Sequence, residues 1–99
     1  MKPIISEPTR THVVRVGDMD EIIIHSTEGA DALYLSFGAH TVSMDACHSV
    51  TVASDLIRRA KDGITLQFDQ GALLLDEEHT LALASVITAH AERLVRVTH

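Results

Sequence analysis

Two segments of this chain resemble each other when they are aligned without a gap at an offset of 31 residues. The segments are 31–61 and 62–92. Eight aligned positions are identical: Asp31/Asp62, Leu35/Leu66, Phe37/Phe68, Asp45/Asp76, His48/His79, Ala53/Ala84, Ser54/Ser85 and Ala60/Ala91. A fixed internal period restricts a chain to folds that use one small unit more than once. The sequence therefore predicts a tandem repeat at the centre of the fold.

Each unit has the pattern of two short strands joined by a tight turn and followed by a helix. In the first unit, alternating apolar residues flank Gly38-Ala39, and glycine at the first central position suits a two-residue type II′ hairpin. This turn would pair Leu35 with Val42 and collect the large apolar side chains on one face. In the second unit the same register would pair Leu66 with Leu73 around a turn at 69–70.

The two helices are expected to begin after Asp45 and Asp76, because a carboxylate at the N-cap accepts the unpaired amides of the first turn. Apolar residues then recur at helical spacing: Val52, Ala53, Leu56 and Ala60, followed in the second copy by Leu83, Ala84, Ile87, Ala91 and Leu94. Gly63 is expected to end the first helix. Because residues 49–52 are rich in β-branched side chains, a strand there is the alternative to a helical turn.

The predicted fold class is α+β, with one domain over residues 1–99. An extended arm (1–11) and a β-hairpin (12–30) precede the first ββα unit (31–61). The second unit, 62–92, has a helix that runs on to 94, and a tail (95–99) follows. Together these elements make a two-layer structure, in which an antiparallel sheet of about six strands carries both helices on one face.

Length and charge narrow the classes of function. A chain of 99 residues has room for one core. Its formal net charge is -6, and its basic residues are scattered, which argues against a nucleic acid as a direct partner. The N-terminal residues lack the apolar run of a signal peptide, and no stretch has the length of a membrane span. The sequence therefore predicts a cytoplasmic protein that binds no membrane.

The lone cysteine, Cys47, lies beside His48, a pairing that could make a nucleophile with its base. His48 recurs in the second unit as His79, whereas Cys47 is replaced there by Glu78. No motif supplies a third orienting group or an oxyanion site, so we expect no catalytic residue, no cofactor and no enzyme activity. His48 and His79 are the candidates for a shared metal or ligand site. A register that places His12 opposite His25 would add two more imidazoles, which alone do not complete a zinc site.

Several strands are apolar on both faces, although helices cover only one. Ile23, Tyr34 and Leu74 are therefore predicted to form an exposed interface. The leading hypothesis is a small acidic non-enzymatic interaction module that forms a homodimer and binds or inhibits a protein partner; small accessory proteins of phages and mobile elements have this composition. The alternatives are a ligand- or metal-binding module built on the repeated histidines and an acidic decoy that mimics nucleic acid.

Overall fold

The structure is a computed structural model that describes residues 9–16, 20–68 and 71–95. Four strands come first: β1 (Thr9–Val16), β2 (Asp20–Thr27), β3 (Leu33–Phe37) and β4 (His40–Met44). Helix α1 (Ala46–Arg59) follows and passes into a short 3₁₀ helix, η1 (Ala60–Asp62). Strands β5 (Ile64–Phe68) and β6 (Gly71–Leu75) and helix α2 (Glu77–Ala91) complete the described chain.

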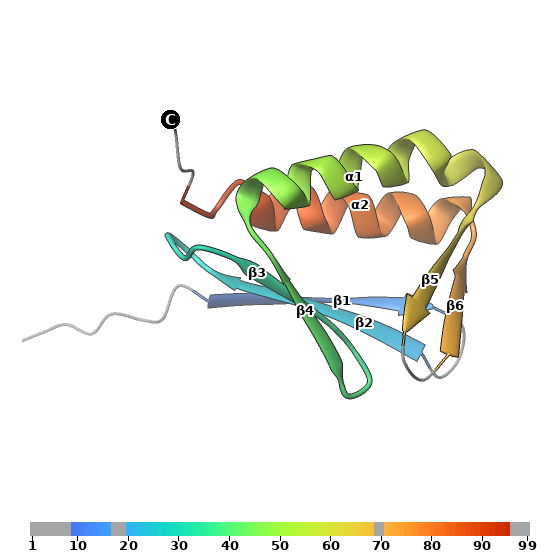
Figure 1. Cartoon of the computed structure of the whole chain (residues 1–99), viewed down its shortest axis with the longest axis horizontal. Coiled ribbons are helices and arrows are strands. Elements are labelled where there is room, and N and C mark those ends of the chain that lie inside the picture. The colour runs from blue at the N-terminus through green and yellow to red at the C-terminus, as the bar shows by residue number, and fades with distance from the viewer. Residues whose placement is uncertain (1–8, 17–19, 69–70, 96–99) are drawn as a thin grey trace, which may run out of the picture.

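The strands form two antiparallel sheets. One has four strands in the order β1-β2-β3-β4, and the other is the β5-β6 hairpin alone. Both helices lie side by side on one face of the four-stranded sheet and run in opposite directions (Figure 1). The α+β class and the antiparallel pairing are thus confirmed.

The prediction of one sheet of about six strands is wrong, because β5 and β6 pair only with each other in the described chain. The cause lies in α1. At about 1.5 Å per residue, its 14 residues carry the chain about 21 Å along the helix layer before β5 begins. The second hairpin therefore forms at the far end of the molecule (Figure 1). The two ββα segments share an order of elements, but their hairpins occupy different places in the fold.

The hairpin registers follow from their turns. Leu35 pairs with Val42 in the first hairpin, and Leu66 pairs with Leu73 in the second, as the sequence predicts. Gly38 has a φ of 62°, and Ala39 has no positive φ, which is the combination that a type II′ turn requires. The turn predicted at 69–70 lies outside the described residues.

The helix starts are also confirmed. The Asp45 carboxylate accepts a hydrogen bond from the His48 amide at 2.7 Å, and the Asp76 carboxylate accepts one from the His79 amide at 2.8 Å. Residues 49–52 belong to α1, so the strand alternative is wrong: the cap starts the helix before the β-branched stretch. Gly63 ends the 3₁₀ extension with a φ of 75°.

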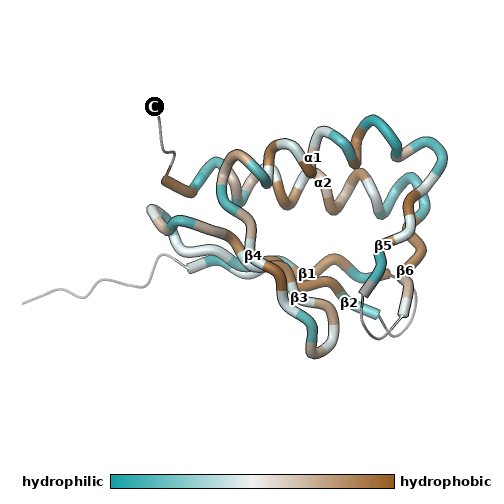
Figure 2. Tube along the Cα trace, viewed as in Figure 1, coloured by the Kyte–Doolittle hydropathy of each residue, from teal (hydrophilic) through white to brown (hydrophobic). Residues whose placement is uncertain are grey.

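The core lies between the helices and the four-stranded sheet. The hydrophobic stretches of β1 and β2 lie beneath the helices (Figure 2). Ile22, Ile24 and Leu33 are fully buried there, against Leu83 and Ile87 of α2. Leu73 and Leu75 of β6 join the same cluster, which anchors the second hairpin to the helix layer.

The first strand begins inside the segment that the sequence predicts as an extended arm. Strand β1 begins at Thr9, three residues before the predicted hairpin, so only residues 1–8 of the predicted arm lie outside the described chain. Of the predicted tail, 96–99 also lies outside it. No helix in the described ranges is long and apolar enough to cross a membrane.

Candidate functional site

The face of the four-stranded sheet that points away from the helices is the candidate interaction surface, here called the open face. Alternation along each strand decides which side chains it carries. Because Val14, Val16, Ile22 and Ile24 face the helices, their odd-numbered neighbours face outward. The register places the following residues on the open face: Thr9, Thr11, Val13, Arg15, Glu21, Ile23, His25, Thr27, Tyr34, Ser36, Thr41 and Ser43.

An apolar patch occupies the middle of the open face. Val13 lies directly opposite Ile23 on the neighbouring strand, and Tyr34 lies diagonally from Ile23 on β3, opposite His25. Val13 is 48% exposed and Tyr34 is 42% exposed, while Ile23 between them is half-buried. The Tyr34 ring stacks on His25 with their centroids 5.2 Å apart. These contacts hold the aromatic ring against the sheet, so the patch is a defined surface.

The charges on the open face balance. Among the described residues of this face, Arg15 and Glu21 are the only Lys, Arg, Asp or Glu residues, and they pair across the strands at 3.4 Å. Hydroxyl groups around the patch pair with one another, as in the 2.9 Å contact between Ser36 and Thr41. The open face therefore has no net charge when histidine is neutral, although the whole chain carries -6.

The structure brings two of the three predicted interface residues together. Ile23 and Tyr34 are neighbours on the open face, but Leu74 belongs to β6 in the other sheet. Leu74 is 73% exposed and lines a shallow hollow with Val16 and Asp20 at the edge of the molecule. Its side chain points away from the core because its neighbours on β6 point into it. Sequence reasoning missed Val13 and considered Val14 for this face instead, but the hairpin register turns Val14 toward the helices, where it is 6% exposed, and Val13 outward.

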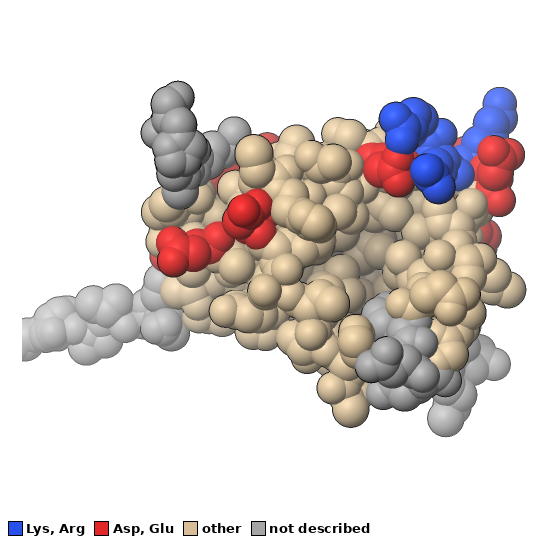
Figure 3. Space-filling view, viewed as in Figure 1, with Lys and Arg blue, Asp and Glu red and all other residues tan. Residues whose placement is uncertain are grey.

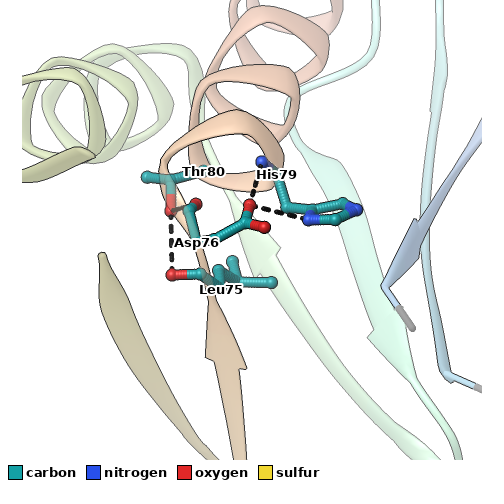
Figure 4. A network of polar contacts seen from close by, with 4 residues as sticks. All are labelled: Leu75, Asp76, His79 and Thr80. Carbon is teal, nitrogen blue, oxygen red and sulfur yellow. Dashed lines mark hydrogen bonds and ion pairs between the residues drawn. The ribbon is translucent and has the colours of Figure 1, made fainter. Parts of the chain in front are cut away.

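His48 and His79 lie far apart. Each is in the first turn of its helix, and the helices run in opposite directions, so the two rings lie at opposite ends of the helix layer. His79 instead turns back to its own cap, where its Nδ1 lies 2.8 Å from an Asp76 carboxylate oxygen (Figure 4). The His79 amide and ring lower the pKa of the Asp76 carboxyl group. One chain does not bring the repeated histidines to a common ion.

Other candidate ligands are also dispersed. Cys47 is exposed in the first turn of α1. His12 pairs with Ile24, so the register that would place it opposite His25 is wrong, and the two imidazoles lie on different faces of the sheet. No three His, Cys, Asp or Glu side chains gather closely enough to hold a metal ion in the part of the chain that the structure describes.

Positive charge gathers at one end of the molecule. Figure 3 shows Lys and Arg side chains at the end of α1 and in η1, where Arg58, Arg59 and Lys61 lie. Arg58 and Arg59 both pair with Asp55, the latter at 3.3 Å, so neighbouring acid offsets part of this charge. Arg58 and Arg59 line one side of a groove of about 580 Å³ between α1 and β5.

A buried polar chain connects α2 to the first hairpin. His90 lies in the last turn of α2 and has 0% exposure. Its Nδ1 lies 2.5 Å from the Ser26 hydroxyl oxygen, and its Nε2 lies 2.7 Å from Nδ1 of His12. Burial, followed by the charges of neighbouring groups, lowers the pKa of His90 from 6.5 to about 4. His90 is therefore neutral at pH 7.

Sequence reasoning missed Ser26 and His90 and gave His12 a different neighbour, His25, although two signals of the buried pair were present. His90 falls between Ile87 and Leu94 on the apolar stripe of α2, and Ser26 continues the buried alternation of Ile22 and Ile24. Polar residues at apolar positions are buried only with hydrogen-bond partners. These two positions therefore indicated a buried pair.

Comparison of the chain with models of protein families, with curated proteins and with solved structures finds no match.

Proposed function

We propose that this protein is a non-enzymatic interaction module that forms a homodimer through the open face of its four-stranded sheet. The observation that carries the proposal is the exposed apolar patch of Val13, Ile23 and Tyr34 on a face that neither helix covers. Contiguous apolar surface of this kind marks sites of protein interaction. The acidic remainder of the surface is left to engage a protein partner.

A second copy is the occupant that the charges favour. Two acidic molecules repel each other wherever their charged surfaces meet. The open face carries one cation and one carboxylate, which already pair with each other. Two open faces therefore meet without like charges in contact, and a twofold arrangement would place the patch of one copy on that of the other.

The size of the patch sets the expected strength. Full burial of a large apolar side chain contributes about 1.5 to 3 kcal/mol. Ile23 is already half-buried, so the three side chains together would contribute less than three times that value. Loss of translational and rotational freedom offsets much of the gain. We expect a dimer that dissociates on dilution.

The test is the molar mass in solution. Light scattering coupled to size-exclusion chromatography, at loadings from about 5 to 500 µM, should show the wild type rising from 10.8 kDa towards twice that mass. Ile23→Glu places a charge at the centre of the patch and would set two carboxylates against each other across the twofold axis. This variant should remain folded by circular dichroism and should stay monomeric.

Leu74→Glu is the matched control, because Leu74 is more exposed than any residue of the patch but lies in the other sheet. It should dimerise like the wild type. A wild type of 10.8 kDa at every loading would refute the proposal. Loss of the dimer in Leu74→Glu but not in Ile23→Glu would move the interface to the second hairpin.

We also propose a duplicated ββα unit over 31–61 and 62–92 and a cytoplasmic location. The matching hairpin registers and the matching caps at Asp45 and Asp76 support the duplication. A single exposed thiol, Cys47, is consistent with a compartment in which thiols stay reduced.

A further inference from the structure

The hydrogen-bond chain Ser26–His90–His12 joins three elements of the fold through the buried ring of His90. His90 belongs to α2, Ser26 to β2 and His12 to β1. Both ring nitrogens of His90 are used, and its ring meets that of His12 edge-on with centroids 4.9 Å apart. Ser26 is 1% exposed, whereas His12 reaches the surface. The His12 end of this hydrogen-bond chain is therefore accessible to protons from solvent, whereas the Ser26 end is buried.

Counting protons shows which states this geometry accepts. A neutral imidazole has one donor and one acceptor. If His12 gains a second proton, its Nδ1–H donates to Nε2 of His90, and Nδ1–H of His90 still donates to Ser26. Both hydrogen bonds are then kept, and the one between His12 and His90 becomes charge-assisted. If His90 is protonated as well, two N–H groups face each other across 2.7 Å with no acceptor between them.

The surroundings of His90 oppose its charged form. Burial disfavours the imidazolium most, and the groups that act on His90 from the elements around it are His12 and Arg10 of β1, His25 of β2, and Arg93 just after α2. All of these lower its pKa. A protonated His90 is thus stabilised by leaving its site and reaching water.

Two backbone hydrogen bonds join the segment that would move with His90 to the first hairpin. The Gly29 amide donates to the Arg93 carbonyl at 2.9 Å, and the Val95 amide donates to the Ala30 carbonyl at 3.0 Å. These two bonds tie residues 93–95 to the loop between β2 and β3. The chain through His90 ties the preceding turn of α2 to the strands themselves.

We propose that Ser26–His90–His12 is a proton-operated latch, whose opening in mild acid releases the last turn of α2 and residues 92–95 from the first hairpin while the sheet stays folded. The latch is independent of the proposed dimer, since all three side chains are on the helix side of the sheet or on α2. It gives the fold a second state that pH alone selects.

Amide hydrogen exchange of the full chain tests the latch at the two bonds that depend on it. Protection of the Gly29 and Val95 amides, corrected for intrinsic exchange, reports the opening of the segment. An opening linked to one proton should lower this protection about tenfold for each pH unit between 6.5 and 4, the ordinary and folded pKa values of His90. The Leu35 amide in β3 should keep its protection over this range.

Two variants make the test specific. His90→Gln keeps a donor and an acceptor but does not titrate, so the protection of Gly29 and Val95 should become independent of pH. His79→Gln removes a histidine from the other end of α2 and should behave as the wild type. If His90→Gln does not fold, the ring resonances of His90 in the wild type replace it, and their titration midpoint should coincide with the loss of protection.

Three outcomes would overturn the latch. Protection of Gly29 and Val95 that is unchanged down to pH 4 would show that His90 does not control the segment. An equal loss of protection in His90→Gln would assign the effect to another group. Simultaneous loss at Gly29, Val95 and Leu35 would indicate global unfolding in place of local release.

Discussion

Leu35 and Leu66 occupy matching positions in the two hairpins but differ in burial. Leu35 is 7% exposed beneath the helices, whereas Leu66 is half-buried and lines the groove between α1 and β5. The cost of removing a leucine side chain depends on how much contact is lost. The repeat aligns Leu35 with Leu66 and so predicts equal burial at the two positions, but the structure shows that this prediction is wrong.

We therefore predict unequal effects of the same substitution. Leu35→Ala should lower the free energy of unfolding by about 2 to 5 kcal/mol, and Leu66→Ala by less than about 2 kcal/mol. Urea denaturation followed by circular dichroism measures both. Equal losses would mean that the second hairpin packs as tightly as the four-stranded sheet.

Among the elements, the junction between η1 and β5 depends on one glycine. Gly63 has a positive φ, and a Cβ there would lie 2.9 Å from the Leu75 carbonyl oxygen of the adjacent strand. The backbone of β6 cannot move away without disturbing Leu75, which is 2% exposed. A side chain at Gly63 thus meets both an unfavourable dihedral angle and a clash.

Gly29 separates these two effects, because it has a similar φ of 80° and nothing within 4 Å of its Cβ position. Gly29→Ala should cost about 1 to 2 kcal/mol, the penalty of the left-handed conformation alone. Gly63→Ala should cost clearly more in the same thermal or urea denaturation. A Gly63→Ala variant as stable as Gly29→Ala would show that the junction yields to the added methyl group.

How well the sequence predicted each element depends on how local its cause is. The hairpin register at Leu35 and the caps at Asp45 and Asp76 are set by residues a few positions away, and these predictions are confirmed. The grouping of strands into two sheets depends on where α1 delivers the chain, which no local pattern records. The contact between His12 and His90 spans 78 positions, so only the unusual polarity of its members was visible.

For the whole molecule, α2 is the element on which the other parts depend. It packs on β1 and β2 and against α1, and residues just beyond its end bind the loop after β2. Its apolar side chains Leu83 and Ile87 are fully buried against the sheet. Without α2, the helix-facing side of the first hairpin is open to water.

A chain truncated after Leu75 should therefore fail to form a closed core. We expect it to bind a hydrophobic dye such as ANS much more strongly than the full chain, because Ile22 and Ile24 lose the cover that keeps both at 0% exposure. Fluorescence at equal concentration compares the two. A truncated chain with the weak dye binding of the full protein would show that α1 alone can cover the sheet.

The position of α2 at the end of the described chain has a consequence for synthesis. The strand order β1-β2-β3-β4 is also the order in which a ribosome makes the strands, so this sheet has everything it needs for pairing early. Helix α2, which covers β1 and β2 beside α1, is made only after both hairpins. A nascent chain therefore completes this sheet before residues 77–91 can finish the cover over Ile22 and Ile24.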